Sequence, residues 1–149
     1  MDKKMENFVL DIMKNHNILT LATLREDGYP QATTVTYIND GLTIYFITAR
    51  DSQKVKNITS CNKVSLTIDK DYEDWKKVKG LSMAATAEVL TNPDEIENAM
   101  NWFVKKFPFV ADMPQPEDPM ALAVVKITPK IISVLNYELG LGHTDLVEV

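Results

Sequence analysis

Three residues in the first half of the chain have the types and spacing of a phosphate-binding corner. Thr48, Ser52 and Lys54 lie where a predicted strand enters a predicted helix. Two hydroxyl groups, one ammonium group and the free N–H groups of a helix N-terminus would converge there. Arg50 could add a bidentate contact, whereas Asp51 would have to point away. The alternative is that Ser52 only caps the helix and that Lys54 is a solvated surface residue.

The strand before this corner is rich in threonine and could also contact a ligand. Thr33 and Val35 would share one face of the strand, and Thr34 and Thr36 would share the other. Hydroxyl groups on a face that lines a cleft could hydrogen-bond a ligand. Threonine is also simply common in strands, so these residues carry little weight on their own.

Two further side chains are weaker candidates for a ligand or a subunit contact. Trp102 could cover a planar ring, but its place beside an apolar helical stripe favours core packing. His143 follows Gly140 and Gly142, which permit close backbone approach. It could contact a ligand or a partner subunit, or it could belong to a flexible terminus.

The chain lacks the motifs of self-sufficient catalysis. It has two histidines and one cysteine, and neither metal-ligand spacing nor a nucleophile motif occurs. We therefore expect no metal site and assign no catalytic residue. If the protein performs chemistry, we expect a bound cofactor to carry it.

Period-two patterns predict the elements that must position these residues. Consecutive strands are joined by turns too short for crossover helices, so an antiparallel sheet is expected. One buried face per strand favours a closed or partly closed barrel with helices at its periphery. The patterns predict helices over 4–15, over 53–60 and from Pro93, and strands over 18–25, 31–38, 42–48, 64–68, 81–90, 121–128 and 131–137, the last two separated by Pro129 and Lys130.

Length and charge place the chain among ordinary globular domains. Its 149 residues are enough for one domain with a real core, spanning residues 1–149. The net charge of -5 argues against a nucleic-acid partner, and no apolar run has the length of a membrane span. The N-terminus lacks a signal-peptide pattern, and the single Cys61 excludes an internal disulfide. We expect a cytoplasmic protein.

Together these residues resemble the pyridoxamine 5'-phosphate oxidase-like proteins, a group of flavin-binding split barrels. The resemblance is clear over residues 16–90, weaker beyond them, and nearest to the general-stress-protein branch. The motifs that carry it are Leu21-Ala22-Thr23, Asp27-Gly28-x-Pro30, the strand ending in Thr48, Ser52-x-Lys54 and Asn62-x-Val64-Ser65-Leu66.

The resemblance implies a six-stranded antiparallel split β-barrel that forms a homodimer and holds flavin mononucleotide (FMN) at the subunit interface. An FMN-dependent oxidoreductase of unknown substrate is then the expected function. The family's phosphate contacts match Thr48, Ser52 and Lys54. Its ribityl and ring contacts match Thr33, Thr34, Val35 and Ile47.

This chain departs from the family pattern at three places. Thr33 stands where an arginine often follows Gly28-x-Pro30, so the site has less positive charge. A glutamine near the flavin of the oxidases has no match around Gly80, and their C-terminal tryptophan and arginine have no match either. True pyridoxamine-phosphate oxidase activity is therefore not expected. A deazaflavin, a non-catalytic flavin or haem carrier, a stress-linked sensor and a purely structural barrel remain open alternatives.

Overall fold

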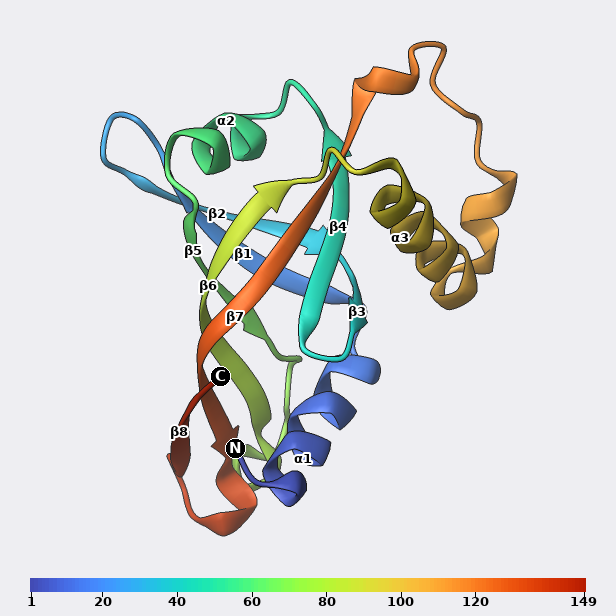
Figure 1. Cartoon of the computed structure of the whole chain (residues 1–149). Coiled ribbons are helices and arrows are strands. Elements are labelled where there is room, and N and C mark those ends of the chain that lie inside the picture. The colour runs from blue at the N-terminus through green and yellow to red at the C-terminus, as the bar shows by residue number, and fades with distance from the viewer.

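The protein is built around one curled antiparallel sheet. The computed structural model describes residues 1–149. The strands are β1 (Ile18–Leu24), β2 (Pro30–Thr36), β3 (Ile38–Asp40), β4 (Thr43–Ala49), β5 (Lys63–Ile68), β6 (Lys79–Val89), β7 (Leu122–Asn136) and β8 (Thr144–Glu148). Their order in the sheet is β2-β1-β5-β6-β7-β4-β3, and β8 pairs with the end of β7 (Figure 1).

The architecture confirms a split barrel and corrects the strand count. The sheet has eight strands, instead of the seven predicted from the patterns or the six implied by the resemblance. Tyr37 separates the short β3 from β2, and residues 144–148 form β8 where a flexible terminus was one of the two interpretations. The predicted break at Pro129 is wrong, because β7 continues through it. Pro129 pairs at a register shift between Ala84 and Ala85, an irregularity at which a strand tolerates proline.

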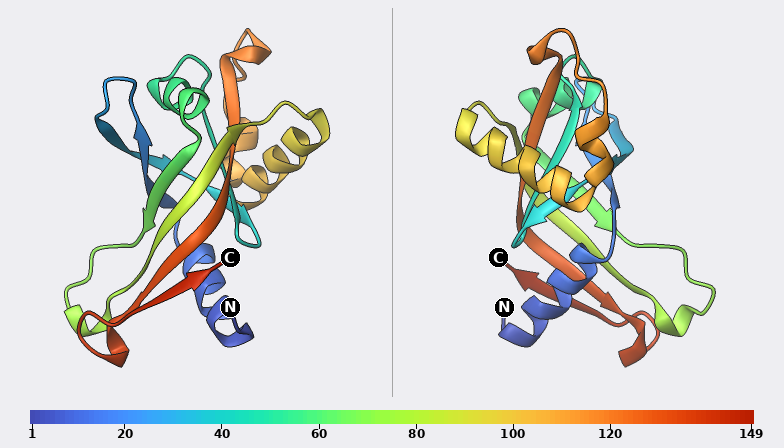
Figure 2. Two further views of the ribbon diagram at one scale, coloured as in Figure 1. Left: turned by 60° about the vertical axis from the view of Figure 1, so that its left-hand side comes forward. Right: turned by 90° about the vertical axis from the view of Figure 1, so that its right-hand side faces the viewer.

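Three α-helices cover the sheet at different places: α1 (Lys3–Lys14), α2 (Gln53–Ser60) and α3 (Pro93–Lys106) (Figure 2). Ser52 and Asn92 cap α2 and α3 by accepting backbone N–H groups, and for Ser52 this was one of the interpretations of the sequence. Short 3-10 turns are η1 (Trp75–Lys77), η2 (Pro108–Asp112), η3 (Pro119–Ala121) and η4 (Tyr137–Leu139). No helix combines the length and the apolar character needed to cross a bilayer.

Both faces of β4 are buried in the middle of the strand. Ile44 and Phe46 point into the main core, which is enclosed by the sheet and α1. Tyr45 points the other way, into a second core beneath α3 that also contains Phe103 and Val124. The middle of β4 is therefore held between two packed layers, just before the strand leads toward α2.

The sheet stays open between β2 and β4. β2 pairs only with β1, so its other edge has unpaired backbone groups. β4 pairs with β7 along its length, but on the opposite side β3 reaches only as far as Tyr45. The free edges of β2 and of the end of β4 lie near each other. Unpaired backbone donors and acceptors at such a split are available to a ligand.

Candidate functional site

A pocket of about 520 Å³ lies at the split in the barrel. One wall comes from Thr34–Thr36 of β2, and a second from Ile47 and Thr48 of β4. Lys54 of α2 lies at one end. The remaining wall comes from α3 and from residues 107–121, which join α3 to β7 and which we call the strap. The volume is in the range of pockets that bind small molecules and cofactors.

The end of the pocket at α2 is polar and carries one charge. Lys54 is the only charged residue in the lining, and no carboxylate lies within ion-pair distance of its ammonium group. The backbone N–H groups of Gln53 and Lys54 donate to no acceptor in the chain. A helix N-terminus with free N–H groups favours an anion. This end of the pocket therefore suits a small oxyanion.

Ser52 and Thr48 hold the corner together while leaving hydrogen-bonding capacity free. The Ser52 hydroxyl oxygen accepts from the Val55 N–H at 3.4 Å, and the Thr48 hydroxyl donates to Ser52 Oγ at 3.4 Å. Both distances are long for hydrogen bonds of this kind. These hydroxyl groups are consequently weakly engaged and can turn toward an anion at the helix terminus.

The opposite wall of the pocket is apolar and aromatic. Phe103, Phe107 and Phe109 form a row with ring centroids 6.5 and 6.1 Å apart. Met100 of α3 and Met113 of the strap complete this wall. Phe109 remains 63% exposed although it lines the pocket. A ligand with an anionic group at one end and a planar apolar body would match both halves of the pocket.

Five of the eight residues predicted to contact the cofactor line this pocket. Ser52 stands directly behind Thr48, where it caps α2, and does not line the pocket itself. The predicted residues that line it are Thr34, Val35, Ile47, Thr48 and Lys54.

Arg50 points toward the strap and does not line the pocket. Its Nε donates to the Met120 carbonyl oxygen at 2.8 Å, and its Nη2 donates to that of Leu122 at 3.0 Å. Its backbone N–H donates to the Ala121 carbonyl oxygen at 2.9 Å. Arg50 therefore holds the C-terminal end of the strap beside the polar end of the pocket.

Thr33 lies on the face of β2 that turns toward the barrel interior. Its hydroxyl oxygen is buried and has no hydrogen-bond partner. A buried unpaired hydroxyl group is unfavourable unless a ligand or a water satisfies it. The position where the family often has an arginine is therefore occupied here by an unsatisfied polar group.

Trp102 and His143 lie away from the pocket within one chain. The Trp102 ring packs against Tyr45, with the centroids 5.6 Å apart. His143 Nε2 lies 2.9 Å from Asp145 Oδ2, just before β8. β8 is at the opposite end of the sheet from α2 (Figure 1). Only a second copy of the chain could bring His143 near this pocket.

Sequence reasoning missed the strap as part of the site. The segment FPFVADMPQPEDP, residues 107–119, contains none of the candidate residues named from the sequence. Its aromatic residues and its prolines, which limit backbone freedom, were the available signal. In the structure it supplies Phe107, Phe109, Val110, Met113, Pro114, Gln115 and Pro116 to the lining.

The open sheet and its pocket define a split-barrel protein that can hold an anionic, partly apolar small molecule. Residues 1–136 match the pyridoxamine 5'-phosphate oxidase family. The chain belongs to this family.

Known proteins similar to this chain have different descriptions. General stress protein 26 of Bacillus subtilis is 27% identical over 134 residues, which are 86% of each chain. The structure of General Stress Protein 26 from Bacillus anthracis superposes with a TM-score of 0.72 at 16% identity, covering 97% of this chain and 98% of the other. The structure of a haem-binding protein from Mycobacterium smegmatis superposes with a TM-score of 0.81 at 19% identity, covering 99% of this chain and 59% of the other. At these two identities the structural similarity concerns the fold alone.

Proposed function

We propose that the protein is a flavoprotein that binds FMN in the pocket between β2, β4, α2 and the strap. The observation that carries the proposal is the polarity of this pocket. One unpaired ammonium group lines the pocket beside the free N–H groups of the first turn of α2, and an aromatic wall lines it on the side of α3 and the strap. FMN combines a phosphate monoester with a planar, largely apolar ring system, so the donor set fits it.

The residues of the pocket would bind and shield the cofactor. Lys54 and the first turn of α2 would hold the phosphate group. Thr34, Thr36 and the free edge of β2 offer hydrogen bonds along the chain that joins phosphate to ring. The aromatic wall would exclude water from the ring. Bound FMN would supply electron or hydride transfer, and we infer an oxidoreductase on that basis.

Apart from Lys54, the pocket lining offers no side chain that commonly acts as a general acid or base. No histidine, cysteine, tyrosine, aspartate or glutamate lines the pocket. With Lys54 engaged by the phosphate group, the substrate or a second subunit would supply any other acid or base that a reaction requires.

The outer face of the sheet supports a homodimer. Cross-strand pairs place two uncharged rows of residues side by side on β2, β1, β5, β6 and β7, although a quarter of all residues are charged. One row is Thr34, Thr20, Thr67, Ser82 and Ser133, and the next is Ala32, Ala22, Ser65, Ala84 and Ile131.

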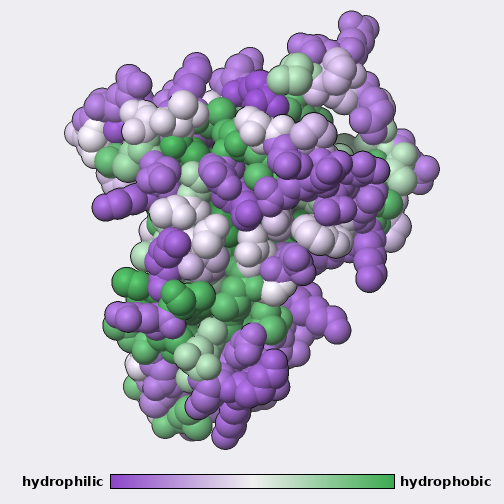
Figure 3. Space-filling view, viewed as in Figure 1, coloured by the Kyte–Doolittle hydropathy of each residue, from purple (hydrophilic) through white to green (hydrophobic).

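The first row continues onto β8 at Leu146, whereas the second row ends beside the charged Glu148, and the face reaches the pocket at Thr34. Leu146 pairs with Ser133 and is 72% exposed, and Figure 3 shows hydrophobic surface over β7 and β8. Thr34 belongs both to the face and to the pocket lining. We therefore propose that a second copy packs on this face and closes the pocket from outside.

Haem is the second candidate ligand. A haem-binding protein has the same fold, and Met100 and Met113 offer thioether groups, which can ligate haem iron. FMN remains the first proposal because the lining contains no histidine, cysteine or tyrosine, the other usual protein ligands of haem iron.

An absorbance spectrum tests the proposal. The purified protein would be measured as isolated, and again after addition of FMN and desalting. The two visible bands of oxidised flavin, retained after desalting, are the expected result. A Soret band in place of flavin bands would favour haem. A blank spectrum after both treatments would contradict the proposal and favour a structural barrel.

A further inference from the structure

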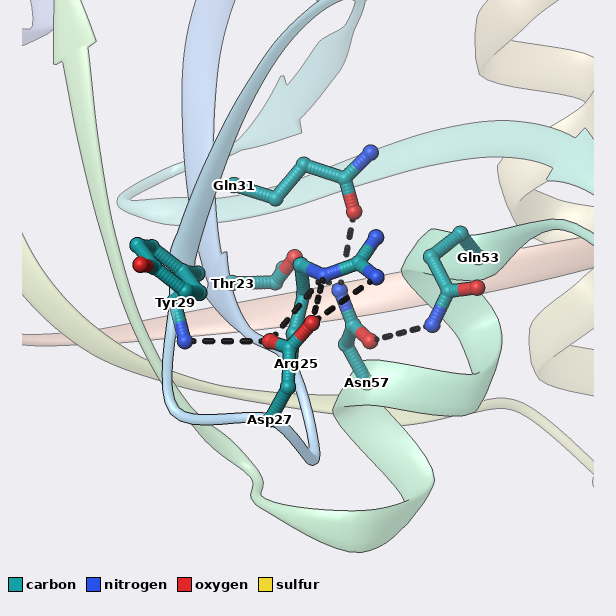
Figure 4. A network of polar contacts seen from close by, with 7 residues as sticks. All are labelled: Thr23, Arg25, Asp27, Tyr29, Gln31, Gln53 and Asn57. Carbon is teal, nitrogen blue, oxygen red and sulfur yellow. Dashed lines mark hydrogen bonds and ion pairs between the residues drawn. The ribbon is translucent and has the colours of Figure 1, made fainter.

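A buried amide group joins α2 to the β1–β2 hairpin. The side chain of Asn57 is completely buried. Its Nδ2 donates to Thr23 Oγ1 at 3.0 Å and to Gln31 Oε1 at 3.2 Å, and its Oδ1 accepts from Gln53 Nε2 at 2.8 Å. Figure 4 shows these side chains meeting between the helix and the hairpin.

Packing α2 against the hairpin does not require the directional hydrogen bonds that this network supplies. An apolar residue at position 57 would also fill the space, without the cost of burying an amide group. Hydrogen bonds restrict the rotation and translation of the helix more narrowly than apolar contacts do, because they depend on angle as well as distance. Both N–H groups of the Asn57 amide and its oxygen are engaged, so the network is satisfied and rigid.

The network connects the two walls of the pocket's polar end. Gln31 lies on β2, the strand that supplies Thr34 to the pocket. Gln53 is the first residue of α2, and its free N–H group stands beside Lys54. Through Asn57, the first turn of the helix is therefore tied to the strand that faces it.

We propose that Asn57 is a positioning residue that makes the protein select the phosphorylated flavin, FMN, over riboflavin. Asn57 sets the distance between the anion-binding turn of α2 and the free edge of β2. This inference rests on the proposed function. Because Lys54 is the only cation in the lining, selection for phosphate depends on the placement of the two N–H groups beside it.

The test compares the dissociation constants of FMN and riboflavin. Riboflavin has the same ring and side chain without the phosphate group, so their ratio isolates the polar end of the pocket. Asn57→Leu should weaken the binding of FMN about tenfold or more and leave the binding of riboflavin nearly unchanged. Thr59→Ala is the matched control, because Thr59 Oγ1 donates only to the Val55 carbonyl oxygen of the same helix. The control should change neither constant.

Gln53→Met provides a second variant in case Asn57→Leu fails to fold. Gln53 is largely exposed, so its replacement removes the link to Asn57 at little cost to stability. It should lower the preference for FMN in the same direction as Asn57→Leu.

The outcomes separate this inference from the proposed function. A wild-type protein that binds neither flavin overturns both. If wild type prefers FMN but the variants lose affinity for FMN and riboflavin equally, only the positioning role is overturned. A merely structural residue would affect the binding of both ligands.

Discussion

At the scale of single residues, Lys54 is the charge on which ligand binding should depend. Lys54→Ala should weaken FMN by about ten- to hundredfold, because a hydrogen bond to a charged group contributes about 1.5–3 kcal/mol. The loss should be larger at low ionic strength, where screening is weak. Titration of FMN at two salt concentrations measures both effects.

Lys56→Ala is the control for this prediction, because Lys56 is exposed on the same helix and does not line the pocket. Equal losses in the two variants would mean that only the overall charge matters.

Replacing Thr33 should have different effects on the stability of the free protein and on that of the FMN complex. Thr33→Val removes the buried unpaired hydroxyl group at nearly constant volume, so the free protein should become more stable by about 1 kcal/mol. For a chain of this length, that corresponds to a rise of about 2–4 °C in melting temperature. Thermal unfolding with and without FMN measures the effect. A variant that is destabilised only when FMN is present would indicate that the hydroxyl group contacts the cofactor.

Contacts between residues close together in sequence were predictable from the residues themselves, whereas contacts across the fold were predicted only where the family resemblance supplied them. The corner formed by Thr48, Ser52 and Lys54 follows from a strand end and a helix cap, which are local features. The carbonyl partners of Arg50 are 70 and 72 residues away in the sequence. Asn57 likewise pairs with Thr23 and Gln31 on a separate hairpin, so nothing around it in the sequence indicates its role.

At the scale of elements, Lys106 anchors the end of α3 to the end of α1 and to the β2–β3 connection. Its Nζ donates to the His16 carbonyl oxygen at 2.8 Å and to that of Tyr37 at 3.2 Å. No carboxylate pairs with it. Burial lowers the pKa of Lys106 from 10.5 to about 8.

The lowered pKa of Lys106 predicts that the folded protein becomes more stable as the pH rises above 8. Between pH 8 and 10.5 the unfolded chain binds more protons at Lys106 than the folded chain, so the free energy of unfolding should rise with pH in this window. Below pH 8 the contribution should be constant. The free energy of unfolding would be measured in urea for wild type and Lys106→Met from pH 7 to pH 10. The value for wild type minus that for the variant should increase above pH 8.

Lys105→Met is the control for this pH dependence, because Lys105 is the exposed neighbour on the same turn. A difference that stays flat across the pH range would show that Lys106 titrates normally in the folded protein.

The strands were predictable from the alternation of apolar and polar residues, but the uninterrupted course of β7 through Pro129 was not. Val64, Leu66 and Ile68 alternate with polar residues, and all three are buried in β5. Pro129 indicated a break because proline lacks an N–H group for the ladder. The structure accommodates it at the register shift in β6, and that shift depends on a partner strand about 45 residues earlier.

At the scale of the whole molecule, the uncharged outer face should control assembly. Ala84→Arg places a charge in the middle of this face, and a dimer that buries it would lose an apolar contact and gain an unpaired charge. We expect a monomer, and weaker FMN binding because Thr34 shares the face and the pocket. Sedimentation equilibrium measures the change in mass.

Asn101→Arg adds the same charge on an exposed position of α3 and should leave the mass unchanged. A wild-type protein that is already monomeric, or an Ala84→Arg variant that stays dimeric, would contradict the proposed interface.

The position of β7 in both chain and sheet has a consequence for synthesis. β7 is the common partner of β4, β6 and β8, yet it begins only at Leu122. While the first 121 residues emerge from the ribosome, β4 and β6 each present an open edge, and open edges can pair with other nascent chains. A chain terminated before Leu122 should therefore aggregate or require a chaperone, and no smaller barrel should form from it.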